Sequence, residues 1–178
     1  AVIGFFTLVL ITLIVIIVPP FLPFSEAEID PLAFNMPPSA KHLLGGDDVG
    51  RDVLSRLLYG GRVSLAVGIF STAVSVIVGS PLGMLAAFYR GAFEVVVMRL
   101  SDIFMSFPST ILILFLVSMF GPSIITVTVV IGVLGWPKFA RQIYGSVLSR
   151  REKDYIEGAV AIGAKDKLII TKYILPNA

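Results

Sequence analysis

Residues 63–88, VSLAVGIFSTAVSVIVGSPLGMLAAF, contain no charged side chain and decide the class of fold. A helix needs about 20 mostly apolar residues to cross the hydrocarbon core of a bilayer, because no water is there to satisfy its backbone. This stretch exceeds that length, so we expect a membrane-spanning helix that tilts, or kinks at Pro81. Four small residues in it recur every four positions and predict a surface for close helix packing: Ser75, Gly79, Gly83 and Ala87.

The composition extends this interpretation to the whole chain. Apolar residues make up 56% of the sequence, charged residues make up 15%, and the mean hydropathy is +0.94. These values lie well outside those of a soluble globular domain. Three further apolar stretches predict spans: residues 1–18, 95–119 and 124–140. We therefore expect an all-α polytopic membrane protein with four transmembrane helices in this chain.

Residues 19–62 differ from the apolar stretches on either side. The prolines and acidic residues of the first half are typical of a solvated loop, and residues 51–62 have the pattern of an interfacial amphipathic helix. Residues 138–172 hold eight Lys or Arg against four Asp or Glu, whereas residues 19–62 hold four against six. Because cytoplasmic loops carry the excess of Lys and Arg, we expect residues 19–62 outside and the C-terminal segment inside.

Several classes of site are not expected. The sequence has no cysteine, and its single histidine, His42, has no companion at the spacing of a zinc site, so we expect no metal and a solvated His42. A net charge of +2 is too small to indicate nucleic acid binding. The chain has neither a P-loop for nucleotide phosphates nor a nucleophile-elbow motif, so we expect no enzyme activity and no cofactor.

Charged and hydroxyl side chains interrupt the span expected over residues 95–119. Arg99 and Asp102 are three residues apart and can pair on one helix, which lowers the cost of their charge in lipid. Further polar residues continue the same face at helical spacing: Ser106, Ser109 and Thr110. Two interpretations stay open, a buried contact between helices closed by the ion pair and the wall of a translocation pathway.

Residues 150–178 are too polar to span a membrane but carry a clear pattern. Asp154 and Asp166 predict the starts of two short helices, with a turn at Gly163 between them. The first helix carries little side-chain bulk, which favours docking into the groove of another protein. Its small residues are Gly158, Ala159, Ala161 and Gly163. The alternative is an amphipathic helix that lysines hold to anionic lipid.

Residues 157–176 resemble the cytoplasmic EAA loop of ABC importer permeases, whose pattern is E-A-A-x3-G-x9-I-x-L-P. The residues that carry the resemblance are Glu157, Gly158, Ala159, Gly163, Leu175 and Pro176. The sequence departs from the pattern in having Gly158 for the first Ala and Tyr173 for the Ile. The resemblance implies that these residues form the surface that couples the chain to an ATPase subunit.

Residues 42–56, HLLGGDDVGRDVLSR, are similar to a signature of the C-type permease subunit of the peptide and nickel importers. The residues that keep the pattern are Gly45, Asp47, Gly50, Arg51 and Asp52. A plain alternative is a turn that caps the following amphipathic helix through Asp47 or Asp48. Residues 99–102, 107–108 and 136–141 also resemble this group, so the resemblance covers roughly residues 41–178.

This resemblance implies a subunit of six spans, so that two further spans would follow residue 178. It implies a homologous permease partner, two cytoplasmic ATPase subunits that bind ATP and Mg²⁺, and an extracytoplasmic solute-binding protein. The location implied is the cytoplasmic (inner) membrane of a bacterium or archaeon, in contact with lipid. The substrate class favoured is di- and oligopeptides. The alternatives are nickel and, in another class, gradient-driven transport through Asp102 and Arg99.

Overall fold

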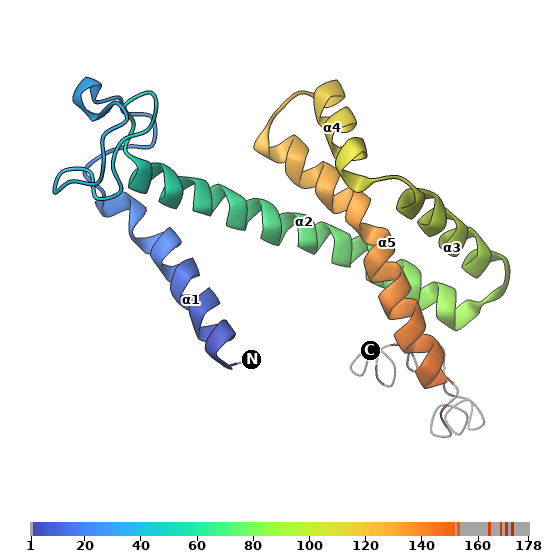
Figure 1. Cartoon of the computed structure of the whole chain (residues 1–178). Coiled ribbons are helices and arrows are strands. Elements are labelled where there is room, and N and C mark those ends of the chain that lie inside the picture. Colours follow the sequence, from blue (N-terminus) through green and yellow to red (C-terminus); the bar gives the residue numbers. More distant parts are fainter. Residues whose placement is uncertain are drawn as a thin grey trace. The chain divides into compact units, whose positions relative to one another are not determined.

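The computed structural model describes residues 2–151 together with residues 153, 164, 168, 170 and 172. In these residues the long elements are all helices, as Figure 1 shows: α1 (Val2–Ile17), α2 (Val53–Tyr89), α3 (Gly91–Ser106), α4 (Ser109–Phe120) and α5 (Ile124–Arg151). Two single-turn 3₁₀ helices, η1 (Pro19–Phe21) and η2 (Pro31–Ala33), lie between α1 and α2. The expected all-α class is confirmed. The chain divides into two compact units, residues 1–68 and 69–178.

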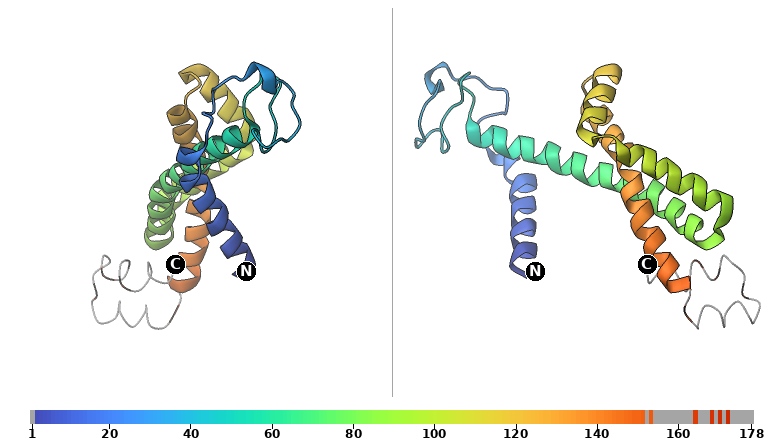
Figure 2. Two further views of the ribbon diagram at one scale, coloured as in Figure 1. Left: turned by 90° about the vertical axis from the view of Figure 1, so that its left-hand side faces the viewer. Right: turned by 45° about the vertical axis from the view of Figure 1, so that its right-hand side comes forward.

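In the first unit, residues 19–56 fold into a small lobe that ends in the first turn of α2 (Figure 2). Two isolated antiparallel bridges, Ile29 with Arg51 and Gly46 with Asp52, close its loops. Next to the lobe, Arg62 donates hydrogen bonds to the carbonyl oxygens of Val15 and Ile16, at the end of α1. A cation at the C-terminal carbonyls of a helix is favourable, since these groups lack partners within the helix.

Helix α2 runs without interruption from Val53 to Tyr89. The amphipathic helix expected over residues 51–62 is therefore the first part of the same helix as the span expected over 63–88. At 1.5 Å per residue α2 is about 55 Å long, nearly twice the roughly 30 Å of the hydrocarbon core. The length of α2 thus leaves room for a charged N-terminal part outside the core, and this part contains Arg56 and Arg62.

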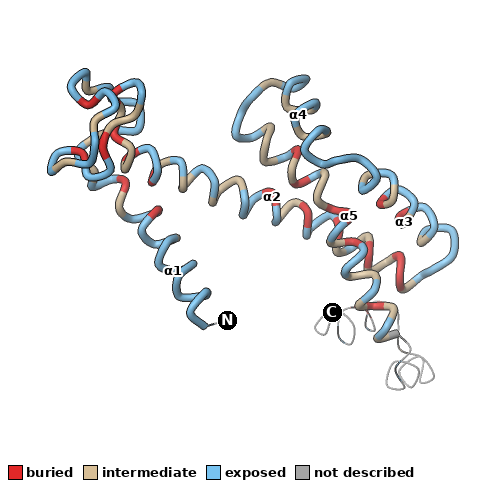
Figure 3. Tube along the Cα trace, in the orientation of Figure 1, coloured by how far each residue is buried: buried red, intermediate tan, exposed pale blue. Residues whose placement is uncertain are grey.

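In the second unit, α3 and α4 both pack against α5, and α5 crosses the C-terminal half of α2 (Figures 1 and 2). Trp136 of α5 lies edge-on to Phe104 of α3, with ring centroids 5.9 Å apart. Ala86 and Ala140 are fully buried in the same cluster. Figure 3 shows the buried residues of this unit gathered where α2 and α5 cross.

The span expected over residues 95–119 is not one straight helix. Helices α3 and α4 meet at an angle of 86° across Phe107 and Pro108. Proline has no backbone N–H, and it disfavours helical geometry at the residue before it, which explains an extended Phe107 with ψ of 141°. The pair is a broken span or a re-entrant loop.

By length and composition, two described helices, α2 and α5, are able to cross a membrane, and the bent pair of α3 and α4 makes a third if it is one span. Helix α1 is apolar but has 16 residues. The four spans expected from the sequence thus correspond to two long helices, one bent pair and one shorter apolar helix.

Candidate functional site

The lobe is organised around His42, which the sequence suggested was solvated. That expectation was wrong, because the residue is 1% exposed. Its Nδ1 lies 3.0 Å from Oδ1 of Asp52, and its Nε2 lies 3.3 Å from Oδ2 of Asp30. Phe24 stacks on the imidazole ring, with centroids 4.6 Å apart. The sequence hides this arrangement, since the two aspartates are ten and twelve residues away from His42.

Both aspartates beside His42 are held as carboxylates. A hydrogen bond from Lys41, 2.6 Å away, and one from the backbone N–H of Leu32 lower the pKa of Asp30 to about 2. Burial raises the pKa of Asp52, but hydrogen bonds from Ser55 and His42 outweigh this effect and leave that pKa lowered. Two negative charges therefore face one imidazole ring.

Asp52 is also the residue that caps α2. Its Oδ2 accepts a hydrogen bond of 2.7 Å from the backbone N–H of Ser55, three residues on, which satisfies one of the free donors of the first turn. The sequence suggested Asp47 or Asp48 for this role. The difference arises because α2 begins at Val53, so both candidates lie too far before its first turn.

Asp47 instead binds the loop that follows it. Its Oδ1 accepts hydrogen bonds of 2.9 Å from the backbone N–H groups of Val49 and Arg51, and its Oδ2 pairs with the side chains of Arg51 and Arg56. The backbone hydrogen bond from Arg51 is the main cause of a strongly lowered pKa of Asp47, while burial opposes the shift. The carboxylate of Asp47 therefore holds the turn that connects Gly46 to Asp52, the two residues of one bridge.

Close backbone packing explains the glycines of the signature. Gly45 and Gly50 have φ of +80° and +84°, a region that other residues rarely adopt. A Cβ at Gly45 would lie 2.3 Å from the carbonyl oxygen of Met36, and one at Gly50 would lie 2.5 Å from that of Asp30. All five signature residues thus have structural roles inside the lobe.

A small polar pocket lies on the surface of the lobe. It is lined by Glu26, Ala27, Arg51, Arg56 and Gly60. Asp47 pairs with both arginines, so the pocket does not present a free cation pair.

The small-residue stripe of α2 is where α5 packs, as its sequence predicts. A Cβ on Gly79 would lie 2.4 Å from the carbonyl oxygen of Trp136, and one on Gly83 would lie 2.1 Å from that of Ala140. The hydroxyl of Ser75 donates to the carbonyl oxygen of Gly132 at 2.8 Å. Backbone approach this close is possible only without side chains, so the stripe serves helix packing.

Asp102 of α3 pairs with Arg141 of α5, a partner that spacing along one helix cannot reveal. The expected partner, Arg99, lies 3.9 Å away and its side chain is 79% exposed, so it is the outer member of the group. A second polar contact joins the same helices, since the hydroxyl of Tyr144 donates to Glu94. Glu94 and Asp102 are two helical turns apart, a spacing that could have indicated one polar seam along α3.

Ser106 stays on α3 with Asp102, four residues further on, but the bend separates Ser109 and Thr110 from that face. Ser106 ends α3, whereas Ser109 and Thr110 begin α4 on the far side of the 86° bend. The expected face of Asp102, Ser106, Ser109 and Thr110 required a continuous helix, and Pro108 interrupts it.

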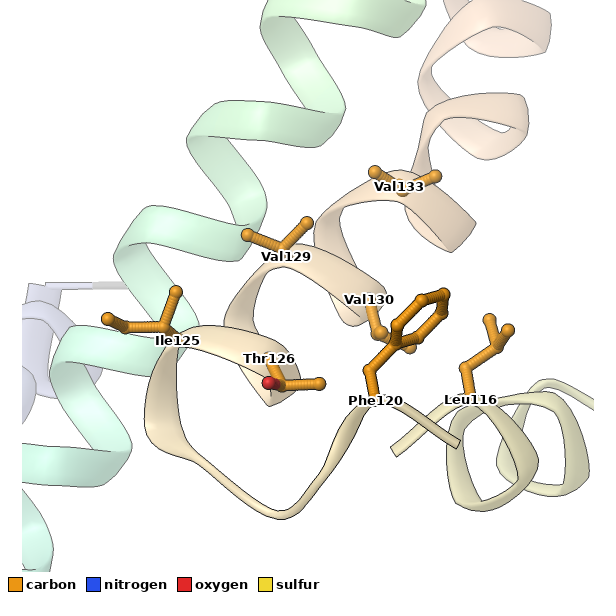
Figure 4. Close-up of a pocket in the computed structure, with 7 residues that line it drawn as sticks. All are labelled: Leu116, Phe120, Ile125, Thr126, Val129, Val130 and Val133. Atoms are coloured by element: carbon orange, nitrogen blue, oxygen red, sulfur yellow. The ribbon is translucent and has the colours of Figure 1, made fainter. Parts of the chain in front are cut away.

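An apolar pocket of about 520 Å³ lies between α4 and α5. Figure 4 shows Leu116 and Phe120 of α4 beside Val130 of α5. The one hydroxyl of its lining, that of Thr126, bonds to Ser123 at 2.9 Å. The pocket therefore offers apolar packing and no group that would orient a polar solute.

The residues of the expected coupling surface, Glu157, Gly158, Ala159, Gly163, Leu175 and Pro176, lie outside the described part of the chain.

Comparisons with known proteins bear on the whole chain. Residues 79–178 match the family described as binding-protein-dependent transport system inner membrane component. Over its whole length, the chain is 36% identical to the dipeptide transport system permease protein DppC of Alkalihalophilus pseudofirmus, of which it covers 59%. It is 38% identical, over 86% of its length, to the glutathione transport system permease protein GsiD of Pectobacterium atrosepticum, of which it covers 51%. It is 34% identical, over 99% of its length, to the oligopeptide transport system permease protein OppC of Haemophilus influenzae, of which it covers 58%. The chain thus spans between half and three fifths of these relatives.

Proposed function

Because this chain belongs to the family of binding-protein-dependent transport system inner membrane components, we propose that it forms part of the membrane pathway of an ATP-driven importer of di- and oligopeptides. The observation that carries the proposal is how much of the chain is similar to these transport proteins. The family match begins at Gly79, in the contact of α2 with α5, and continues through the segment 150–178. The relatives with peptide-transport names extend the likeness to residues 1–78.

The family and the apolar helices make this an integral membrane protein. We place it in the cytoplasmic membrane of a bacterium or archaeon, with residues 19–62 outside, because the basic residues concentrate after position 138. The relatives are named permease proteins, and in this proposal the chain is not itself an enzyme. In this proposal ATP and Mg²⁺ are bound by two separate cytoplasmic subunits, a homologous permease completes the pathway, and a solute-binding protein delivers the peptide to the outer face.

The names of the relatives favour peptides over nickel, since they specify dipeptides, oligopeptides and glutathione. A gradient-driven transporter is less well supported. Coupling to ions needs an intramembrane carboxylate that can change its charge or partner, and Asp102 is already neutralised by Arg141. The ion pair instead suits a contact that holds α3 to α5.

The coupling role proposed for residues 157–163 is tested by crosslinking. A cysteine replaces Ala159 or Ala161 in this cysteine-free chain, and the complex is assembled with its ATPase subunits in lipid vesicles. We expect a crosslink to the ATPase subunit whose yield changes with ATP, and uptake of a labelled dipeptide that stops when ATP is withheld. Uptake that continues without any ATPase subunit, with no crosslink from either position, would refute the proposal in favour of gradient-driven transport.

A further inference from the structure

The lobe contains the one side chain of this sequence whose type ordinarily changes charge near neutral pH. The sequence has a single histidine, His42, and no cysteine. His42 is also the most enclosed ionisable group of the lobe, at 1% exposure. A change of charge there cannot be absorbed by water, so its neighbours must absorb it.

Hydrogen-bonding capacity decides which form of the ring fits. An ionised carboxylate only accepts hydrogen bonds, and a neutral imidazole has a single N–H to donate. Since Nδ1 faces Asp52 and Nε2 faces Asp30, the neutral ring would leave one nitrogen lone pair against a carboxylate oxygen. The imidazolium ion donates to both carboxylates.

The other groups around the ring do not change this result. Lys41 adds a positive charge, but it pairs with Asp30 and its side chain is 62% exposed. Phe24 covers one face of the ring and carries no charge. Ser55 holds the second oxygen of Asp52, which therefore remains aimed at the start of α2. The charged groups that face the ring are thus two carboxylates and one outer ammonium.

We propose that His42 is a protonation-dependent latch, whose imidazolium ties the turn before η2, through Asp30, to the N-terminus of α2, through Asp52. Loss of one proton leaves a ring that can bond only one of the two aspartates, so one side of the tie opens. The latch is closed when both ring nitrogens carry a proton and weakens when one proton is lost, so a rise in pH favours opening. This inference does not depend on which solute the protein carries.

The two carboxylates set the lower limit of the pH range in which the latch is closed. The pKa of Asp30 is about 2 and that of Asp52 is also lowered, so both stay ionised in mildly acidic solution. Mild acidity therefore closes the latch instead of breaking it. The expected orientation puts the lobe on the outer face of the membrane, where external pH would act on it.

The latch is tested by thiol labelling of the whole protein in lipid vesicles. Ser55 is fully buried and touches both Asp52 and Phe24, so a Ser55→Cys variant reports opening of the lobe. A separate Ala40→Cys variant provides an exposed reference, and the ratio of the two labelling rates removes the pH dependence of thiol reactivity. We expect this ratio to rise at least about tenfold from about pH 5.5 to about pH 8.5, the effect of losing a charge-assisted hydrogen bond on a buried group.

Two variants identify the group responsible. His42→Gln keeps a polar side chain that has no ionisable group, so its labelling ratio should not change with pH. Asp30→Asn keeps the acceptor for Leu32 and places an amide donor opposite Nε2, which suits the neutral ring. With that variant the ratio should not rise with pH. If the labelling ratio of His42→Gln is high at every pH, its lobe is open throughout, and the pH dependence of Asp30→Asn then tests the latch by itself.

Imidazole ¹⁵N signals supply an independent measurement, because the single histidine gives one pair of resonances. We expect both ring nitrogens to be protonated at the acidic end, and the loss of one proton to coincide with the rise in labelling of the Ser55→Cys variant. The proposal is overturned if the labelling ratio does not change while the ring titrates, or if both variants show the same rise as the parent.

Discussion

Arg141 of α5 lies against Asp102 of α3, and this ion pair joins two helices within the part of the chain that the family match covers. The side chains are 44% and 41% exposed, so the pair is neither fully buried nor freely solvated. An unpaired charge in a membrane helix is costly, so each residue makes the other tolerable. The contact between α3 and α5 therefore explains why each of these apolar helices contains a charged residue, and no role in transport is needed to explain them.

Replacing Arg141 with Gln should destabilise the contact of α3 with α5 by about 1–2 kcal/mol, between the values for surface and buried pairs. Asp102 would then keep its charge without its main partner. The thermal unfolding temperature of the protein in detergent measures the loss, and peptide uptake should fall with it.

Arg99→Gln is the matched control, since it removes the same charge from the outer position. Its side chain is 79% exposed and 3.9 Å from Asp102, so a change below about 0.5 kcal/mol is expected. Equal losses of thermal stability in the two variants would show that Asp102 needs positive charge nearby in general and not the specific pair with Arg141.

The sequence predicted most of the helices because their signals are local. The stripe of Ser75, Gly79, Gly83 and Ala87 indicated a packing face from spacing alone, and α5 occupies that face. The bend at Pro108 also had a local signal, but apolar residues on both sides favoured one continuous span. Composition outweighed a single proline in that interpretation.

The site was less predictable because it depends on contacts between distant residues. His42 has no ligand-like neighbour in the sequence, and only the folding of two loops brings Asp30 and Asp52 to its ring. Arg141 likewise reaches Asp102 across 39 positions, beyond any pattern on one helix. Spacing rules describe the neighbours on one element, whereas these groups meet through tertiary packing.

Gly83→Ala should weaken the contact of α2 with α5 by about 2–3 kcal/mol, as expected of overpacking at a close backbone approach. The added methyl group would lie 2.1 Å from the carbonyl oxygen of Ala140, so the helices must separate. Gly145→Ala in α5 is the control, because a Cβ there meets nothing within 4 Å. That variant should be neutral or slightly stabilising, since alanine favours helix. Thermal unfolding in detergent compares them, and equal destabilisation would contradict this packing of α2 on α5.

Gly50→Ala should destabilise the lobe more than Gly91→Ala does. Both glycines have positive φ, at +84° and +66°, so both variants incur a conformational cost of about 1–2 kcal/mol. Only at Gly50 would the new Cβ also lie 2.5 Å from a backbone oxygen, that of Asp30. Limited proteolysis within residues 19–56 measures opening of the lobe in Gly50→Ala. Because Gly91 lies outside the lobe, the thermal unfolding temperature in detergent compares the two variants, and equal losses would mean that the backbone angle alone requires glycine.

Acid should open the lobe through Asp47 and Asp30. Hydrogen bonds from Arg51 and from Lys41, respectively, are the main causes that lower the pKa of the two carboxyl groups below the ordinary 3.8. A group with a lowered pKa contributes stability that is present above its ordinary pKa and is lost as pH falls through its pKa in the folded protein. The contribution of Asp30 should therefore disappear between about pH 4 and about pH 2, and that of Asp47 at still lower pH.

Pepsin, which is active in this range, measures the effect as the rate of cleavage within residues 19–56. Asp47→Asn removes the charge that pairs with Arg51 and Arg56, so its lobe should already be cleaved rapidly near pH 4, with little further change on acidification. Asp48→Asn is the matched control, because Asp48 is exposed and adjacent in sequence. It should follow the parent curve. If the two variants are cleaved alike at every pH, the ionised Asp47 does not hold the loop, and acid must open the lobe through Asp30 alone.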